Sequence, residues 1–139
     1  MKAKSIVLAT VLLLYIIPVL AGTASPPGAV VYIISPTNGE VMKSPITVKF
    51  GLKGMGVAPA GVDKPNTGHH HLLIDLEKSP SFTAPIPADD NHKHFGGGQT
   101  EAIVELKPGK HTLQLIMGDM NHVPHDPPVI SERITIVVK

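Results

Sequence analysis

The sequence predicts an all-β domain: an immunoglobulin- or fibronectin-like antiparallel β-sandwich with long histidine-bearing loops. Apolar residues recur at every second position in several short runs, as strands with one buried face require. The 14 prolines and 13 glycines separate these runs, and no segment keeps a helical period. Two packed sheets are the arrangement that buries several such strands in one small domain.

Six strands are expected along the chain. They cover residues 29–36, 46–54, 69–75, 100–106, 111–118 and 132–139. In the second of them Ile46, Val48 and Phe50 alternate with polar residues or glycine, which predicts one buried face. In the fifth, Met117 is in phase with two leucines, which predicts a core position for it.

Three segments are too long to be tight turns, namely residues 55–68, 77–99 and 119–129. Long irregular loops in a small domain are usually functional or disordered. The last two carry histidine pairs, and the first leads directly into the motif GHHH. We therefore expect the functional residues in these loops and in the strand that follows the first one.

Residues 1–24 are predicted to be a secretory signal peptide, and residues 25–139 a single β-sandwich domain. An apolar run of about 15 residues from Ile6 is followed by small residues, so that a signal peptidase can cut after Ala21 or Ala24. The run is shorter than the ~20 residues that a spanning helix needs. We expect a periplasmic or secreted protein with no stable membrane span after cleavage, and an uncleaved anchor is the alternative.

The composition argues against several classes of protein. With 12 basic and 11 acidic residues the chain has a net charge of +1, which offers no strongly basic face for nucleic acid. Cysteine is absent, so disulfides and thiolate metal sites are excluded. The serines lie in no recognisable nucleophile motif, so we do not expect an enzyme. A histidine and aspartate site acting on a small substrate is the catalytic alternative.

All eight histidines lie between residues 69 and 125. Strand alternation places the first and third histidines of GHHH on one face. A second pair repeats this spacing beside three glycines, and a third pair stands three residues apart among prolines. We interpret these three pairs as candidate metal ligands: His69, His71, His92, His94, His122 and His125.

Four further residues are expected to support the ligands from outside. Asp119 and Asp126 flank the last histidine pair, and a carboxylate can accept a hydrogen bond from the second ring nitrogen of a metal-bound histidine. His70 and His111 are given the same supporting role. Their apolar neighbours also suit the simpler interpretation of packed histidines with satisfied hydrogen bonds.

The expected cofactor is a transition metal, with copper as the first choice and zinc as the alternative, because imidazole suits both ions. Met55, Met117 and Met120 stand close in sequence to the histidines and would add soft sulfur ligands, which favours copper. The function expected is metal storage, delivery or tolerance, with the metal ion and an envelope metal-trafficking protein as partners. The alternative is a structural or adhesion-type envelope domain, in which histidines and aspartates stabilise the loops without metal.

Several long strings of residues 29–139 carry a family resemblance. They include NTGHHHLLID, PIPADDNHKHFGGGQTE, PGKHTLQLIMGD and HVPHDPPV. They resemble an exported, histidine-rich bacterial and archaeal family catalogued as domain-of-unknown-function family 4399. The resemblance implies a small secreted or periplasmic domain, and it brings no established activity.

Overall fold

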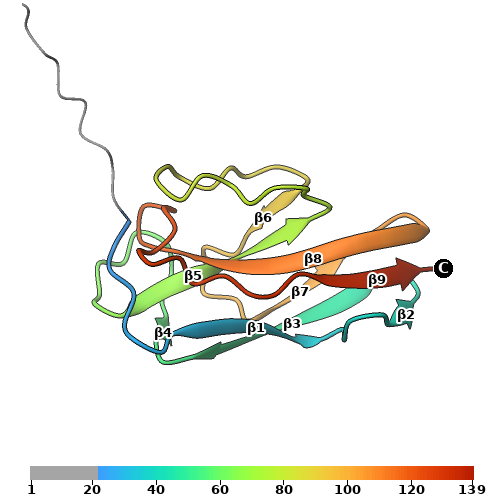
Figure 1. The fold of residues 1–139 in the computed structure, drawn as a ribbon, viewed down its shortest axis with the longest axis horizontal. Coiled ribbons are helices and arrows are strands. Elements are labelled where there is room, and N and C mark those ends of the chain that lie inside the picture. The colour runs from blue at the N-terminus through green and yellow to red at the C-terminus, as the bar shows by residue number, and fades with distance from the viewer. Residues whose placement is uncertain (1–21) are drawn as a thin grey trace, which may run out of the picture.

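The computed structural model describes residues 22–139, which form nine strands in two layers (Figure 1). The strands are β1 (Val30–Ser35), β2 (Val41–Met42), β3 (Ile46–Lys53), β4 (Gly56–Val57), β5 (Thr67–Ile74), β6 (His92–His94), β7 (Glu101–Val104), β8 (Gly109–Gly118) and β9 (Ile134–Val138). No helix that could cross a membrane occurs among these described residues. The signal segment expected from the sequence lies, through residue 21, outside them.

The expectation of an all-β sandwich is confirmed. One sheet has the order β1-β3-β7, and the other has the order β2-β9-β8-β5-β4 with β6 paired to β5. All six expected strands are present, with ends within two residues of the expected ones. The sheets are not purely antiparallel, because β2 pairs with β9 and β4 pairs with β5 in parallel. The short strands β2, β4 and β6 were not expected, and β6 lies inside a predicted loop.

The main core fills the space between the two sheets. Phe50 of β3 packs there with Leu72 of β5 and with Leu115 and Met117 of β8, and all four are buried. The core position predicted for Met117 is therefore confirmed. Burying one such side chain contributes about 1.5–3 kcal/mol. A slip of β5 by one residue would exchange its two faces, so this burial holds the register of the strand.

Strand β5 is buried on both faces, because loops cover the outer side of the larger sheet. Its burial is continuous from residue 68 to residue 74. On the outer face Leu73 packs with Ile86 and Ile116 in a second, smaller cluster. The alternation of β5 puts His69 and His71 on this outer face and His70 on the inner one.

Candidate metal centre

Four histidines meet on the outer face of the six-stranded sheet. His69 and His71 come from β5, His94 from β6, and His122 from the loop that follows β8. Each offers one ring nitrogen, and these four nitrogens all lie within 4.8 Å of one another. We call these four residues the histidine cluster.

Two of the distances inside the cluster are those of neighbouring ligands on one ion. Nε2 of His69 lies 3.0 Å from Nε2 of His71 and 3.2 Å from Nδ1 of His122. Nitrogens bound tetrahedrally to zinc at about 2.0–2.1 Å lie roughly 3.3 Å from one another. The widest pairs must close by on the order of 1 Å to reach such a geometry, and His94 is the most exposed of the four residues.

Strand pairing and two glycines make room for the rings. His71 and His94 are register partners in the antiparallel pair β5–β6, so their side chains stand on the same face. A Cβ atom at Gly118 would lie 2.8 Å from Nε2 of His71. A Cβ atom at Gly96 would overlap the ring of His94. Any larger residue at either glycine would therefore displace a ring of the cluster.

The cluster is buried at its base and open at its surface. His69 and His71 are 0% and 1% exposed, whereas His122 is half-buried and His94 exposed. Burial, together with the neighbouring rings, lowers the pKa of His69 to about 4 and the pKa of His71 to about 3. Partial burial and then His122 lower the pKa of His94. These three rings are therefore neutral near pH 7, which is the form that binds a metal.

The two buried rings are incompletely satisfied within the described part of the chain. Nδ1 of His69 and Nδ1 of His71 are buried without a hydrogen-bond partner there. A buried polar group left unpaired costs about 1–3 kcal/mol. Metal-bound histidines usually donate this second N–H to an oxygen. Here no carboxylate of the described residues bonds Nδ1 of either ring, so the expected supporting aspartates do not take this role. Bonds from Nε2 to a metal ion would offset the cost of this burial.

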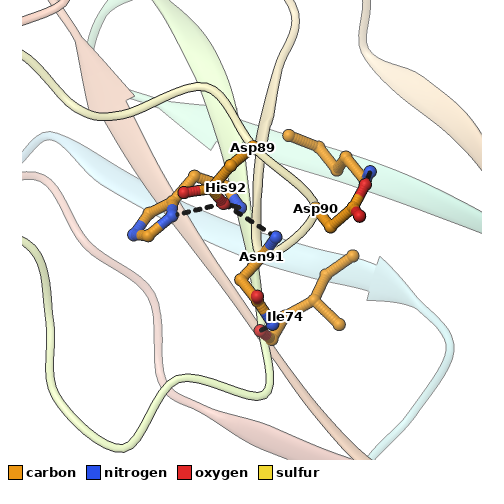
Figure 2. Close-up of polar contacts among 6 residues, drawn as sticks. Ile74, Asp89, Asp90, Asn91 and His92 are labelled. Atoms are coloured by element: carbon orange, nitrogen blue, oxygen red, sulfur yellow. Dashed lines mark hydrogen bonds and ion pairs between the residues drawn. The ribbon is translucent and has the colours of Figure 1, made fainter.

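His92, expected as a ligand, does not belong to the cluster. Its Nδ1 lies 2.8 Å from Oδ1 of Asp89 and donates to it (Figure 2). The same oxygen accepts the backbone N–H groups of Asn91 and His92, and the Asn91 side chain donates to the carbonyl oxygen of Ile74. The hydrogen bond from His92 lowers the pKa of Asp89. His92 thus closes the turn that leads into β6, and Asn91 fastens this turn to the end of β5.

His125, also expected as a ligand, is occupied by the backbone. It is buried, with Nε2 3.1 Å from the carbonyl oxygen of Thr67 and Nδ1 3.4 Å from that of Met117. His122 has a φ of +65°, which turns the chain so that the two histidines of this pair point to different places. The i, i+3 spacing therefore does not form a chelate here.

The carboxylates do not support the rings as expected. Oδ2 of Asp119 accepts the N–H and the hydroxyl of Thr23, and Oδ1 accepts the backbone N–H groups of Asn121 and Val123. Burial raises the pKa of Asp119, but these hydrogen bonds outweigh it and the net pKa is lowered. Asp126 is exposed and pairs through its backbone with Ala24. Both aspartates shape the loop around His122 and hydrogen-bond no imidazole.

The two supporting histidines also lie elsewhere. His70 points into the main core, where its ring centroid is 5.1 Å from that of Phe50. Both of its ring nitrogens lack a partner within hydrogen-bonding geometry among the described residues. Burial lowers its pKa to about 4, by more than the Gln99 backbone raises it. His111 donates from Nδ1 to Asp75 at 2.7 Å and from Nε2 to the carbonyl oxygen of Lys107 at 2.8 Å. Burial lowers the pKa of His111, but these two hydrogen bonds outweigh it and the net pKa is raised.

Two of the three methionines expected as sulfur ligands, Met55 and Met117, belong to the main core instead. Met117 is fully buried between the sheets, and Met55 packs against the same core. Because His70 lies opposite Met117 in the sheet register, that thioether stands on the face away from His69 and His71. The cluster found among the described residues thus consists of imidazoles alone.

The fold and the cluster together define a class: a β-sandwich domain with four convergent histidines that can hold a metal ion. The family model described as "Domain of unknown function (DUF4399)" matches residues 48–139, and the chain belongs to that family. The matched part contains all four histidines of the cluster and confirms the resemblance noted in the sequence. No curated protein and no solved structure matched the chain.

Proposed function

We propose that this protein is an exported module that binds one transition-metal ion at the histidine cluster, for metal storage, delivery or tolerance. The supporting observation is the convergence of four ring nitrogens within 4.8 Å. Nε2 of His69 faces a ring nitrogen of both His71 and His122, and a neutral imidazole has a single N–H to share. Ring nitrogens that converge in this way can all direct their lone pairs at a single cation.

Copper is the ion that we propose, with zinc as the alternative. Because Met55 and Met117 belong to the main core, the choice of copper rests on the imidazoles. For nitrogen ligands, affinity among divalent first-row metals is greatest for Cu²⁺. Four neutral imidazoles leave the charge of a bound dication uncompensated, and the open side of the cluster can then accept water or an anion.

The accessibility of the cluster favours exchange of the ion over a purely structural role. Structural zinc sites are closed by their protein ligands. Here His94 is exposed and His122 half-buried, so a partner can approach the ion from their side. An envelope metal-trafficking protein is the partner proposed. Periplasmic or secreted location is part of the same proposal, and its support is the signal-like sequence of residues 1–24.

Elemental analysis tests this function. The mature protein would be purified without an affinity tag from the periplasm of cells grown with trace copper and zinc. We expect about one equivalent of a single metal, lost in the double variant His94→Ala/His122→Ala, which removes the two accessible ligands. His92→Ala is the matched control and should keep the metal. A folded protein that contains no metal and takes up neither added Cu²⁺ nor Zn²⁺ would overturn the proposal.

The histidines outside the cluster favour a second candidate function, a structural or adhesion domain of the envelope. His92 and His111 each hydrogen-bond an aspartate, and His125 contacts backbone oxygen, so all three hold loops without an ion. If the whole set served only this purpose, metal would leave the melting temperature unchanged. A ligand that binds the native state alone raises it by mass action, so a thermal scan with and without Cu²⁺ distinguishes the two candidates.

A further inference from the structure

Residues 22–25, which we call the amino-terminal strap, are tied to residues 119–126, the His122 loop. In Figure 1 the blue start of the described chain runs beside the orange-red loop after β8. Thr23 donates both its N–H and its hydroxyl to Oδ2 of Asp119, at 3.0 and 2.9 Å. Asp119 is buried, 4% exposed, so these two bonds serve a carboxylate that has little access to water.

The strap also holds the far end of the His122 loop. Ser25 N–H donates to the carbonyl oxygen of Asp126, and Asp126 N–H donates to that of Thr23, both at 3.0 Å. The Ser25 hydroxyl donates to the carbonyl oxygen of Pro127 at 2.8 Å. The two ends of the loop that presents His122 are thus fastened to the same short segment.

The beginning of the strap fits the loop closely. A Cβ atom at Gly22 would overlap the backbone carbonyl of Pro124, so only glycine fits at this position. The strap therefore belongs to the folded domain from Gly22 onward. The domain boundary expected from the sequence, after residue 24, would divide it.

We propose that export processing cuts the chain between Ala21 and Gly22, and that the strap left on the mature protein positions His122 for the metal. In this step a peptidase adds water across the peptide bond, Ala21 keeps the new carboxylate and Gly22 gains the amino group. The sequence permits a cut after Ala21 or after Ala24, because each of these sites ends on alanine, the small residue that a signal peptidase needs before the cut. The later cut would remove Thr23 and leave Oδ2 of Asp119 without the two donors that it has in the structure.

The link from Asp119 to the ligand is short. Oδ1 of Asp119 accepts the N–H groups of Asn121 and Val123 on either side of His122, and the carbonyl oxygen of Asp119 accepts the N–H of His122 at 2.9 Å. Loss of the Thr23 donors would release this carboxylate toward solvent, and the turn that carries His122 would loosen. The positioning half of the proposal rests on the proposed function, and the cleavage half does not.

Mass spectrometry of the exported full-length gene product tests the cleavage. We expect a mature chain that starts at Gly22. A chain that starts at Ser25 or later, or one that keeps residues 1–21, would overturn this half. The result does not depend on whether the protein binds metal, so it stands apart from the test of the proposed function.

Thr23→Val tests the positioning, since it removes the hydroxyl donor and keeps the shape of the side chain. Its control is Thr37→Val, which removes a comparable hydroxyl bond to Glu40 in a distant turn. We expect Cu²⁺ affinity to fall about 3- to 10-fold in Thr23→Val, as for the loss of one hydrogen bond, and to stay unchanged in the control. We also expect faster hydrogen exchange at the Val123 amide in Thr23→Val, whether or not metal binds. Unchanged exchange at this amide, or equal affinity in a protein that does bind Cu²⁺, would overturn the positioning.

Discussion

Seven of the eight histidines of this domain fall into two groups that differ in what their ring nitrogens face, and His70, in the main core, belongs to neither. In one group they face aspartate or carbonyl oxygens, as in His92, His111 and His125. In the histidine cluster they face other imidazoles. An imidazole N–H that meets an oxygen is satisfied without any ion. Converging imidazole nitrogens can all direct their lone pairs at one ion, so neighbouring atoms, and not spacing in the sequence, distinguish a candidate metal ligand from a histidine that fastens a loop.

The largest effect is expected when the two groups are compared on one strand. His94 and His92 are two residues apart on β6 and share a face, but only His94 belongs to the cluster. We expect His94→Ala to weaken Cu²⁺ binding at least about 100-fold, since the loss of an outer partner of a ligand already costs about 10–100-fold. His92→Ala should bind as the parent does. Calorimetric titration measures the Cu²⁺ affinity of both variants. Equal affinities would show that the two groups of histidines do not differ in metal binding.

The pH dependence of stability should sharpen the comparison next. In metal-free protein the pKa values of His69 and His71 are lowered to about 4 and about 3, while in the unfolded chain both are near 6.5. The unfolded state therefore binds more protons between these values, and stability falls as pH decreases. From pH 7 to pH 5 the loss should be about 1–2 kcal/mol for each ring.

Urea unfolding in the presence of a chelator, at pH 7 and at pH 5, measures this loss. The double variant His69→Gln/His71→Gln serves as the control, because its side chains do not titrate in this range. It should show a smaller loss than the parent. A parent protein as stable at pH 5 as at pH 7 would contradict the lowered pKa values.

His70 allows the two faces of β5 to be compared. It lies in the main core, where both ring nitrogens are unpaired within residues 22–139, and a buried polar group of this kind costs about 1–3 kcal/mol. His70→Leu should therefore raise the free energy of unfolding by up to about that amount, because an apolar side chain of similar size removes the cost. Metal affinity should be unchanged, since the opposite face holds the cluster. A large loss of metal binding in this variant would show that the inner face matters to the site.

The smallest effect is expected at His111, which belongs to the group that faces oxygens. His111→Ala removes its hydrogen bonds to Asp75 and to the Lys107 carbonyl, and the free energy of unfolding should fall by about 1 kcal/mol at pH 6. Because the pKa of His111 is raised in the folded protein, its contribution is present below pH 6.5 and is lost as the pH rises above the folded value.

The difference in unfolding free energy between parent and His111→Ala should accordingly shrink from pH 6 to pH 9. Denaturant titrations at several pH values measure it, with metal removed throughout. A difference that grows with pH would show that His111 is bound in its neutral form. Metal affinity should not change in this variant.

The sequence by itself determined the features that depend on local periodicity. Alternation of apolar residues located the six main strands, assigned Met117 to the core, and separated the face of His69 and His71 from that of His70. These predictions hold because a side chain in a strand has only two directions available, and burial of an apolar face selects one of them. The family resemblance rests on long strings of sequence, and the match of the family model to residues 48–139 confirms it.

Only the tertiary structure decided which histidines converge. One member of each of the two loop pairs enters the cluster, His94 because β6 pairs with β5 opposite His71, and His122 because a positive φ turns its loop. The other histidine of each pair hydrogen-bonds an oxygen instead: His92 bonds Asp89, and His125 bonds the backbone. Spacing in the sequence does not distinguish these outcomes, because cross-strand register and the long-range competition of hydrogen-bond acceptors, and not the local sequence, set the direction of each ring.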